Sequence, residues 1–595
     1  MIPARILRRK SSMLTLALTS IVAATTPLCA QELPRGIVDD WSHHHAIFST
    51  PAKELDALKS GHYSDWYKLV TNPRYIMQQK RRNAPIMQPT LVAPMRAVTD
   101  LPVNRRQVSA RIPSRRRPRP NLQKDWSMNN GASAIAANAF PAKYQFSTTA
   151  ASCSDYVVYP TGSGPGNATV IAYSNIYAGT CTGTVPTVAW AYNTGGTSTL
   201  SPVISQDGTQ VAYIQTASNV ASLVLLKPLL TSGGTVTTPA AATLQSAANY
   251  PSCTAPCYTT LTLNGSPNDT NSSPFYVYYS NDTMYVGDDS GKVHKFTGVF
   301  TATPAEVTTG GWPVTASTTI LTSPVFDSGT SQLLFVGDSG GYLHSITTTG
   351  TTSQTVLTSN RMVCGTSGMV DPPIVDSTTE NVYVFVGYGC DTNHNSYVNR
   401  FAAGTAITNT YGQNYASFAN SGATNPAATN LHTGTFDNTY YSGTGNTGFL
   451  YGCVNGVLYQ VPMSGLSGTT NPTVNKYNTM VNTVGTASAC SPITEFYNGT
   501  HDWLFMSVAA NGSATGCTGA CLYNFNVQGA GTTGNVTDGI AAAGGTSGIS
   551  IDNSLSGAGE SQIYYSTLSS QTCAGNGTTG SGSGTCAVQT SQSAP

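Results

Sequence analysis

Charged residues are scarce in this sequence: Asp, Glu, Lys and Arg together make up 9% of its 595 residues. Disordered chains usually combine low hydrophobicity with high charge. This chain instead keeps 31 tyrosines and many valine-rich runs, so we expect it to fold. Beyond the N-terminus it also lacks any apolar run of about 20 residues, the length that a membrane-spanning helix needs. We therefore expect no transmembrane segment in the mature protein.

The N-terminus has the pattern of an export signal. A positively charged stretch, residues 5–10, precedes an apolar run over residues 13–24, which is too short to span a bilayer. Ala30 is a small residue suited to cleavage before Gln31. We expect residues 1–30 to be a signal peptide. The protein is then secreted or periplasmic, and attachment to the cell surface is left open.

The cysteine count agrees with export. Of 13 cysteines, Cys29 lies in the expected signal, which leaves an even number, typical of a disulfide-bonded protein in an oxidising compartment. The rival interpretation, metal binding, is weakened because CTAPC and CTGAC have three residues between their cysteines and no histidine follows at finger spacing. The order of the cysteines suggests six local pairs: Cys153 with Cys181, Cys253 with Cys257, Cys364 with Cys390, Cys453 with Cys490, Cys517 with Cys521, and Cys573 with Cys586.

A net charge of +1 hides a marked asymmetry. Residues 31–125 hold 17 Lys and Arg against 8 Asp and Glu, whereas residues 126–595 hold 7 against 19. The larger part is rich in Thr, Tyr and Val, which favour strands, and in Gly and Asn, which favour turns. We expect four regions: the signal peptide (1–30), a partly helical segment (31–82), a Pro/Arg-rich linker (83–125) and an all-β domain (126–595).

Two short helices are expected in the segment 31–82. Thr50-Pro51 is typical of a helix start and Gly61 of a helix end. Asn72-Pro73 starts the second helix, which ends at the basic run 80–82, where the helix dipole favours cations.

From about residue 140 a unit of roughly 45 to 70 residues recurs, with short apolar strands separated by Gly, Asn and Asp turns. The clearest copies are SPFYVYYSNDTMYVGDDSGKVHKF from Ser273 and SPVFDSGTSQLLFVGDSGGYLHSI from Ser323. Eight candidate units occur, and repeats of this length are what propeller blades require. We predict a β-propeller of seven or eight blades, since the first and last units can combine. A parallel β-helix is the rival, but its coils are usually shorter.

The pattern SPV…DxGT…LFVGDSGGYLHSI is similar to the quinoprotein-like (PQQ-type) repeat family. The resemblance covers roughly residues 155–568 and is strong in the two copies above. It implies the propeller fold and raises a redox role with a quinone cofactor. However, the chain has no adjacent Cys-Cys pair and no evident Glu/Asn/Asp set for a calcium beside a quinone. The block WSHHHAIFS also resembles the start of uncharacterised secreted bacterial proteins, which suggests no function.

The run Gly337 to Gly341 spells GDSGG, the motif of a serine-protease nucleophile. A hydrolase elbow needs a strand that leads into a helix, whereas here a strand leads through a turn into another strand. We therefore expect Ser339 to be non-catalytic. Calcium binding by Asp288, Asp289 and Asp338 is a second interpretation, but the spacing lacks an EF-hand pattern and favours hairpin turns.

Some polar and aromatic residues recur at one position of the repeat. They are His294, His344, Asn399, Tyr459 and Tyr523. Such residues can line a shared surface or pack between blades, and we favour packing.

His43 and His45 are the best metal candidates. On an extended strand they share a face, with Asp39 or Asp40 nearby, and could ligate one ion. A solvated histidine run is the rival interpretation. The default interpretation of the basic segment 105–119 is an unbound linker or one with only non-specific electrostatic attraction. The alternative is a contact for surface polyanions rather than for a specific nucleic acid.

The sequence as a whole favours a non-enzymatic binding protein whose rigid face presents Tyr, Thr and Asn to a glycan or an envelope protein. Two alternatives stay open. One is a propeller enzyme, either a polysaccharide hydrolase or lyase or a quinoprotein dehydrogenase, and the other is a structural envelope component. We predict no catalytic residue and no cofactor, and neither calcium nor quinone has support in the sequence.

Overall fold

A computed structural model describes residues 36–82, 84, 86 and 87, and 121–593. Within the last range it leaves out 132–133, 149, 179, 266–269, 279–281, 351, 365–367, 391–393, 404–406, 408–413, 419–429, 467–471, 482–487, 530–535, 553–560 and 578. The expected signal peptide and the basic segment 105–119 lie outside the described residues. In the described part of the chain, no helix combines the length and the hydropathy of a membrane span.

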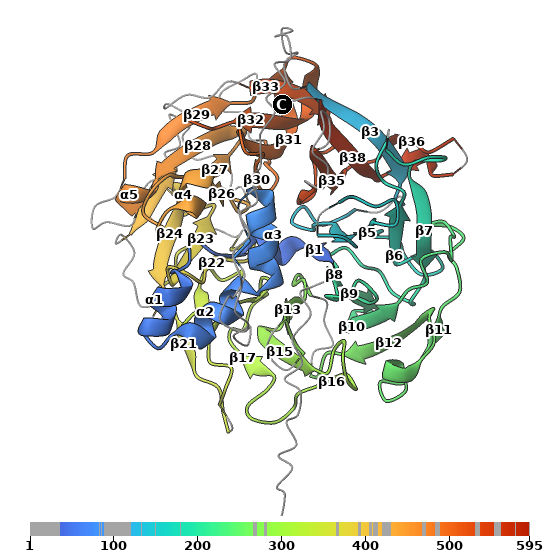
Figure 1. Cartoon of the computed structure of the whole chain (residues 1–595), viewed down its shortest axis with the longest axis horizontal. Helices are drawn as coiled ribbons and strands as arrows, with labels where there is room; N and C mark the ends of the chain where they lie inside the picture. The colour runs from blue at the N-terminus through green and yellow to red at the C-terminus, as the bar shows by residue number, and fades with distance from the viewer. Residues whose placement is uncertain are drawn as a thin grey trace, which may run out of the picture. The chain divides into compact units, whose positions relative to one another are not determined.

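Eight antiparallel sheets are arranged around a common axis, which confirms the predicted β-propeller and fixes the number of blades at eight (Figure 1). The strands succeed one another from the axis outward in most blades, as expected for repeats that fold one after another.

The first four blades contain the following strands. Blade 1 has β4 (Ala142–Gln145), β5 (Tyr156–Pro160), β6 (Val170–Ser174) and β7 (Thr187–Tyr192). Blade 2 has β8 (Val203–Ile204), β9 (Val211–Ala217), β10 (Val220–Lys227), β12 (Cys257–Thr262) and the outer β11 (Thr243–Leu244). Blade 3 has β13 (Phe275–Val277), β14 (Thr283–Gly287), β15 (Lys292–Thr297), β16 (Ala305–Glu306) and β17 (Val314–Thr315). Blade 4 has β18 (Val325–Phe326), β19 (Leu334–Gly337), β20 (Leu343–Ile346) and β21 (Val356–Thr358).

The remaining four blades follow the same order. Blade 5 has β22 (Ile374–Asp376), β23 (Asn381–Val386), β24 (Ser396–Ala402) and β25 (Tyr415–Phe418). Blade 6 has β26 (Thr435–Phe436), β27 (Phe449–Val454), β28 (Val457–Pro462) and β29 (Asn475–Thr479), with the short helices α4 (Asn438–Ser442) and α5 (Met463–Leu466). Blade 7 has β30 (Thr494–Tyr497), β31 (Asp502–Ala514), β32 (Cys517–Asn526) and β33 (Val536–Ala541). Blade 8 has β34 (Ser550–Asp552), β35 (Ser561–Ser566), β38 (Cys586–Ser593) and β3 (Asn121–Asn129), and the hairpin β36 (Gln571–Ala574) with β37 (Ser581–Gly584) follows β35.

Blade 8 closes the ring with strands from both ends of the propeller sequence. Its outermost strand, β3, precedes blade 1 in the chain and pairs antiparallel with β38 from Asn121–Ser593 to Asn129–Cys586. Residue 126, the expected start of the propeller, lies inside this strand. Because the two ends of the propeller sequence share one sheet, the ring cannot open without breaking this pairing.

The Ser-Pro pairs that mark the repeat join neighbouring blades near the axis. The backbone N–H of Ser201 donates to Oγ of Ser273 at 3.0 Å, and the N–H of Ser273 donates to Oγ of Ser323 at 2.8 Å. The N–H of Phe140 donates to Oγ of Ser201 at 2.9 Å. A belt of buried hydrogen bonds therefore runs through blades 1 to 4, which explains why serine recurs at the starts of blades 2 to 4.

The tyrosines form the core rather than the surface, since every tyrosine that the structure describes is buried or half-buried. Their hydroxyls reach across blade boundaries. Oη of Tyr156 in blade 1 donates to the carbonyl of Gly208 in blade 2 at 2.8 Å, and Oη of Tyr523 in blade 7 donates to the carbonyl of Met480 at 3.0 Å. A buried ring with a satisfied hydroxyl suits a narrow space between two sheets.

The segment before β3 contains β1 (Ile37–Asp39), the short 3-10 helix η1 (Trp41–His44), β2 (Ala46–Ile47), α1 (Glu54–Lys59), α2 (Tyr63–Val70) and α3 (Pro73–Arg81). The predicted helix start at Asn72-Pro73 is confirmed, because the side chain of Asn72 caps α3. The first predicted helix is present but begins at Glu54, after Thr50-Pro51, and Gly61 ends it with a φ of 79°. The helix α2 between them was not predicted.

Candidate functional site

The N-terminal segment passes through the centre of the ring as a U-shaped plug, residues 36–49. The strand β1 pairs antiparallel with β4, the inner strand of blade 1. After η1 the chain reverses, and β2 pairs parallel with β22, the inner strand of blade 5. Blades 1 and 5 are opposite each other in an eight-bladed ring, so the plug crosses the axis (Figure 1).

The plug then leaves the ring, and α1, α2 and α3 lie over one face (Figure 1). We call this the helix face. It also carries the loops between the first and second strands of the blades: the N–H of Thr50, for example, donates to the carbonyl of Gly443 in the β26–β27 loop at 3.2 Å. The opposite face carries the turns between second and third strands and the connections from blade to blade, and we call it the turn face.

Side chains of the plug contact the inner strands of several blades. Nε1 of Trp41 donates to the carbonyl of Pro274 in blade 3 at 2.9 Å, and the ring of His44 stacks on Phe140 with centroids 4.5 Å apart. Residues 36–49 are all buried except His44, which is half-buried. The plug therefore fills the channel with the protein's own side chains.

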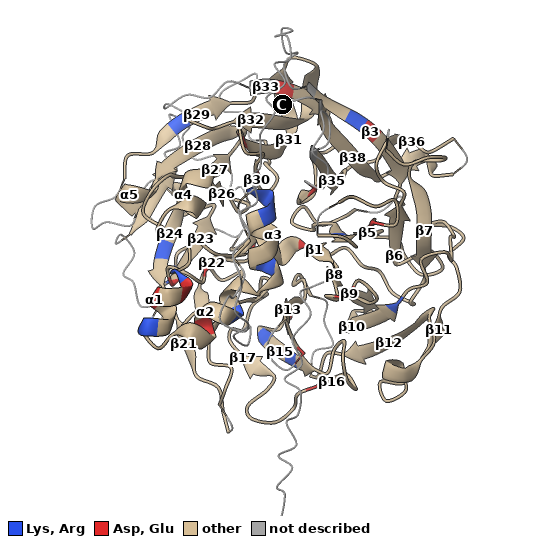
Figure 2. Cartoon of the chain, in the orientation of Figure 1, with Lys and Arg blue, Asp and Glu red and all other residues tan. Residues whose placement is uncertain are grey.

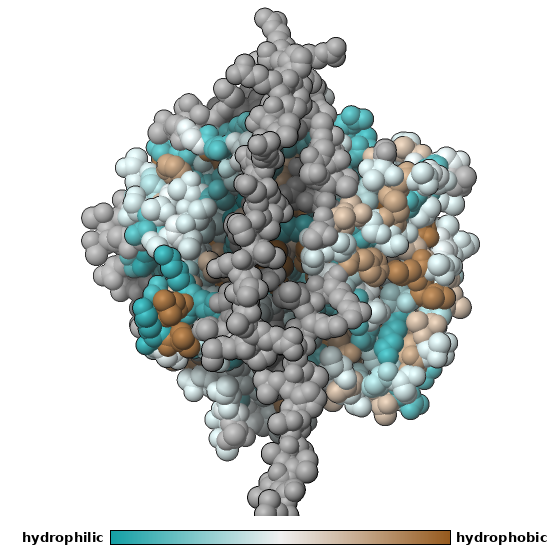
Figure 3. All heavy atoms as spheres, viewed as in Figure 1, coloured by the Kyte–Doolittle hydropathy of each residue, from teal (hydrophilic) through white to brown (hydrophobic). Residues whose placement is uncertain are grey.

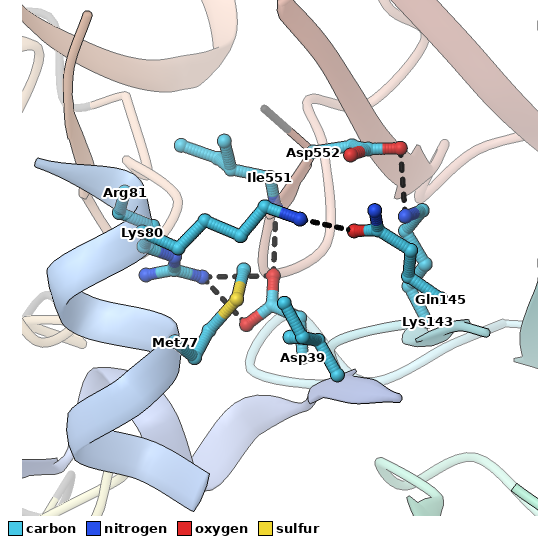
Figure 4. Close-up of a pocket in the computed structure, with 9 residues that line it drawn as sticks. Asp39, Met77, Lys80, Arg81, Lys143, Gln145, Ile551 and Asp552 are labelled. Atoms are coloured by element: carbon cyan, nitrogen blue, oxygen red, sulfur yellow. Dashed lines mark hydrogen bonds and ion pairs between the residues drawn. The ribbon is translucent and has the colours of Figure 1, made fainter. Parts of the chain in front are cut away.

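A pair of buried salt bridges holds the plug and α3 between blades 1 and 8 (Figure 4). Nη2 of Arg81 lies 2.7 Å from Oδ1 of Asp39, and Nζ of Lys143 lies 2.7 Å from Oδ2 of Asp552. The N–H of Ile551 donates to Oδ2 of Asp39 at 3.0 Å. The two cations and the two carboxylates form neutral pairs, which matters because a buried charge without a partner is strongly destabilising. The remaining cavity of about 10 Å³ is the size of one water molecule and leaves no space for an organic ligand.

A second anchor joins the end of α3 to blades 6 and 7. The guanidinium of Arg82 lies 3.3 Å from the centroid of the Tyr441 ring and 3.7 Å from Oε2 of Glu495. Glu495 also hydrogen-bonds Asp502, and burial raises the pKa of both carboxyls. Oε1 of Glu495 and Oδ1 of Asp502 find no donor among the described residues, and a proton held between the two carboxyls would satisfy both oxygens.

These contacts explain part of the charge asymmetry of the sequence. Arg74, Lys80, Arg81 and Arg82 all have partners in the plug or the blades. Figure 2 shows basic residues along α3 and only scattered charges on the ring. The basic end of the described segment is thus matched by polar and acidic groups of the propeller itself.

The two proposed metal ligands, His43 and His45, lie in the plug. The expectation of one extended strand is wrong here, because residues 41–44 form η1. Nδ1 of His45 lies 3.3 Å from the carbonyl of Pro373, whereas neither ring nitrogen of His43 has a hydrogen-bond partner among the described residues. Burial lowers the pKa of His43 well below its usual value, with Arg74 and Arg81 adding to the effect, so its ring is neutral. No group of three His, Cys, Asp or Glu side chains in the described part of the chain is arranged to hold a metal, and the metal site stays a prediction.

On the turn face, blades 3 and 4 each contain a buried Asp–His pair. Nε2 of His294 lies 3.1 Å from Oδ2 of Asp288, and Nε2 of His344 lies 2.9 Å from Oδ2 of Asp338. Nδ1 of His294 also lies 2.7 Å from Oε1 of Glu306. In both blades the aspartate caps the turn that contains it, by accepting backbone N–H groups.

The GDSGG run forms the turn between β19 and β20, so the strand–turn–strand context that we expected is present. The backbone N–H of Ser339 donates to the carbonyl of Ile320 at 2.8 Å, and in the described part of the chain no hydrogen bond joins the side chain of Ser339 to His344. Instead, Oδ2 of Asp338 is bound by Oγ of Ser317 at 2.6 Å and by Nε2 of His344 at 2.9 Å. The oxygens that calcium would need on Asp288 and Asp338 thus already accept protein donors.

The five residues at the recurring repeat position lie on the third strands of their blades and are all buried, in agreement with the packing interpretation. They are His294, His344, Asn399, Tyr459 and Tyr523.

The six predicted disulfides are confirmed, each with the predicted partner. Four of them lie on the turn face of blades 5 to 8. Cys364–Cys390 and Cys453–Cys490 each join a blade-to-blade connection to the end of a second strand or the turn that follows it, and Cys517–Cys521 and Cys573–Cys586 lie where the third strands begin. The turn face is therefore fixed by Asp–His pairs in blades 3 and 4 and by disulfides in blades 5 to 8.

An open hollow of about 370 Å³ lies on the turn face where blades 3 and 4 meet. It is lined by the connection Thr315–Thr319, the turn residues Asp338, Gly340 and Tyr342, and the strand residues His344 and Thr358. A second hollow of about 280 Å³ near blade 2 is lined by Thr197, Thr199, Leu200, Ile214, Thr216, Ser218, Asn219 and Thr270. We call them the blade 4 hollow and the blade 2 hollow.

Sequence reasoning missed the plug. Its signal is the pair of short apolar runs, Ile37-Val38 and Ala46-Ile47-Phe48, on either side of the polar residues 39–45. Two strands separated by a short turn fit this pattern, but nothing local says that each strand adds to a different blade.

No family model and no curated protein matches the chain. The resemblances to the quinoprotein-like repeat family and to secreted bacterial proteins therefore stay predictions, although the propeller fold is confirmed. Among solved structures, BamB from Moraxella catarrhalis is 14% identical, with a TM-score of 0.35, over 79% of this chain and 97% of its own. The WD40 domain of Toxoplasma gondii coronin is 10% identical, with a TM-score of 0.33, over 65% of this chain and 79% of its own. Likenesses this weak carry no functional information, and the fold assignment depends on the strand pairing described above: the chain is an eight-bladed β-propeller.

Proposed function

We propose that the protein is an exported, non-enzymatic binding protein whose turn face engages a glycan or an envelope protein. The observation that carries the proposal is the plug, because residues 36–49 occupy the channel in which a propeller enzyme or a quinone protein would hold its substrate or cofactor. The charged groups beside the plug are paired with one another and leave space for one water molecule.

The Asp–His pair of blade 3 points the same way. A nucleophile activated by histidine needs a hydroxyl or thiol within hydrogen-bond reach of the ring. Both ring nitrogens of His294 bind carboxylates, so blade 3 offers no such group, whereas His344 binds Asp338 and the hydroxyl of Thr358. Both aspartates cap turns. A rigid turn face suits binding, because little conformational entropy is lost when the ligand docks. Export is supported by six disulfides and by the signal-like N-terminus.

The test is a binding screen with residues 31–595, purified with their disulfides intact. Immobilised neutral polysaccharides, acidic polysaccharides and detergent-extracted envelope proteins serve as probes in biolayer interferometry. We expect saturable binding to at least one probe. Hydroxyl-radical footprinting of the complex should then protect second-to-third-strand turns of the turn face and leave α1 unprotected.

Two outcomes would contradict the proposal. Binding to none of the probes would favour the structural-component alternative. A quinone absorption band that persists after incubation with quinone and calcium, followed by gel filtration, would favour the dehydrogenase alternative.

A further inference from the structure

We infer that the blade 4 hollow binds one sugar residue of a neutral glycan, with the ring of Tyr342 as its stacking platform; the inference rests on the proposed binding function. The hollow combines an aromatic ring, several hydroxyls and no cationic side chain among its lining residues. Its volume of about 370 Å³ lies at the low end of ligand pockets, which span about 300–1,000 Å³, so it suits a single ring-sized unit.

The lining residues select a ligand that is neutral and rich in hydroxyls. No Lys or Arg lines the hollow, and the guanidinium at its edge, that of Arg361, already donates through Nε to the carbonyl of Gly340 at 3.1 Å. A carboxylate, sulfate or phosphate group in the hollow therefore has no cation dedicated to it. A cationic ligand has no free acceptor at Asp338, whose oxygens already accept the N–H of Tyr342, Oγ of Ser317 and Nε2 of His344. Hydroxyl groups of Thr and Ser, which both donate and accept, are the partners that a sugar needs.

The hollow also offers apolar surface, which a sugar ring covers with its C–H face. Tyr342 is half-buried at the turn, and its ring centroid lies 6.5 Å from that of His344. An aromatic ring in a hollow that is otherwise lined by hydroxyls is typical of a ligand site.

The hydroxyls of the hollow are held in place before any ligand arrives. Oγ of Ser317 lies 3.1 Å from Oγ1 of Thr319, which accepts the N–H of Gly340 at 3.2 Å. On the other side, Nδ1 of His344 lies 3.0 Å from Oγ1 of Thr358. The Asp338–His344 pair therefore positions hydroxyls on both walls, and such preorganisation reduces the entropy cost of binding.

The blade 2 hollow provides an internal comparison. It lies on the same face and is also lined by threonines, a serine and an asparagine, but it contains no aromatic residue. We expect no sugar binding there. Without a ring on which the sugar can stack, the hydroxyls would only replace hydrogen bonds to water by hydrogen bonds to the sugar, with little net gain in free energy.

The test uses residues 31–595 and an array of neutral oligosaccharides, with acidic oligosaccharides as a second arm. The neutral oligosaccharide that binds best is then titrated calorimetrically against three variants. Tyr342→Ala should weaken the dissociation constant at least tenfold, Tyr342→Phe should stay within threefold of the unchanged protein, and Thr318→Trp should abolish binding by filling the hollow. Tyr497→Ala is the matched control, because Tyr497 is a half-buried tyrosine at the end of β30, next to a first-to-second-strand loop on the helix face, and this variant should bind like the unchanged protein.

The possible outcomes test this inference and the proposed function separately. If a neutral glycan binds but Tyr342→Ala and Thr318→Trp bind it unchanged, while retaining the unfolding midpoint of the unchanged protein, the hollow is not the site and the proposed function stands. If only acidic glycans or envelope proteins bind, the sugar class is wrong and the proposed function again stands. If nothing binds in either experiment, both fall.

Discussion

Asp39 and Arg81 form a buried ion pair that connects the inside of the ring to the helix face. Nη2 of Arg81, at the end of α3, donates to both carboxylate oxygens of Asp39 in β1, at 2.7 and 2.8 Å. Burial raises the pKa of Asp39, and the guanidinium of Arg81 opposes this effect. The pair thus couples the docking of α3 to the insertion of the plug.

Arg81→Met should destabilise the protein strongly. Loss of one partner leaves the other charge buried without compensation, which costs about 3–5 kcal/mol in comparable cases. We expect a decrease of this size in the free energy of unfolding, measured by urea denaturation. The double variant Arg81→Met with Asp39→Leu should recover part of the loss, because no buried charge then remains.

The control for this prediction is Lys68→Ala. Lys68 and Asp65 form an exposed ion pair at 3.6 Å on α2, and exposed pairs contribute about 0–1 kcal/mol. Equal effects of Lys68→Ala and Arg81→Met would mean that the buried pair does not hold the plug.

The Glu495–Asp502 pair should make stability depend on pH. Burial and the charge of Glu495 raise the pKa of Asp502 well above its usual value. A carboxyl with a raised folded pKa contributes its stability at low pH and loses it as the pH rises through that pKa. Asp502→Asn cannot ionise, and its amide can still donate to Glu495. We therefore expect this variant to unfold at a higher temperature than the unchanged protein at pH 8 and at nearly the same temperature at pH 4.

Calorimetric scans at intervals between pH 4 and pH 8 measure this difference. Asp65→Asn, at an exposed site, controls for general charge effects and should follow the unchanged protein. A constant difference between Asp502→Asn and the unchanged protein at every pH would show that the two carboxyls do not share a proton.

His294 should stabilise blade 3 more at acidic than at alkaline pH. Burial lowers the pKa of His294, but hydrogen bonds and charge interactions with Asp288 and Glu306 raise this pKa by more than burial lowers it, so the net shift is upward. Asp288 is also buried, yet hydrogen bonds led by the one from His294 hold its pKa at about 2. A raised histidine pKa stabilises the folded state below the unfolded value of 6.5, and this contribution is lost as the pH rises through the folded pKa.

His294→Gln tests this contribution. Hydrogen bonds to charged groups contribute about 1.5–3 kcal/mol, so we expect a loss of that size at pH 6 and a smaller loss at pH 9, from urea denaturation at both values. His344→Gln is the matched control, because His344 has one carboxylate partner and the hydroxyl of Thr358. A loss from His294→Gln that is the same at both pH values would contradict the charged state.

The repeat and the cysteines made much of this fold predictable. Each blade is a local unit, so the Ser-Pro starts and the Gly-Asp turns indicate the strands in order, and each cysteine pairs with its next neighbour because both belong to one blade or one blade junction. The fold is therefore largely a sum of local patterns.

The plug could not be predicted because it depends on contacts between residues far apart in the sequence. Trp41 binds Pro274, and Asp39 binds Ile551, at separations of more than 200 and 500 residues. Nothing near the HHH run indicates that His43 is buried in a channel rather than exposed to solvent. The blade 4 hollow was missed for a similar reason, since it is formed by a blade connection, a turn and an outer strand that only the assembled ring brings together.

Trp41→Ala should show whether the plug supports the ring from within. The side chain of Trp41 is 1% exposed, contacts the ring of Phe275 edge-on at 5.8 Å and donates to the carbonyl of Pro274. Truncation of a buried tryptophan costs about 3–5 kcal/mol, because a cavity replaces its contacts. We expect a decrease of this size in the free energy of unfolding and faster hydrogen exchange in β13, measured by mass spectrometry.

Leu55→Ala is the control, because Leu55 is exposed on α1, where Figure 3 shows a small apolar patch, and surface changes usually stay within about 0.5 kcal/mol. Unchanged exchange in β13 together with a small loss of stability would mean that blade 3 is held by its neighbours alone and that the plug occupies the channel without stabilising it.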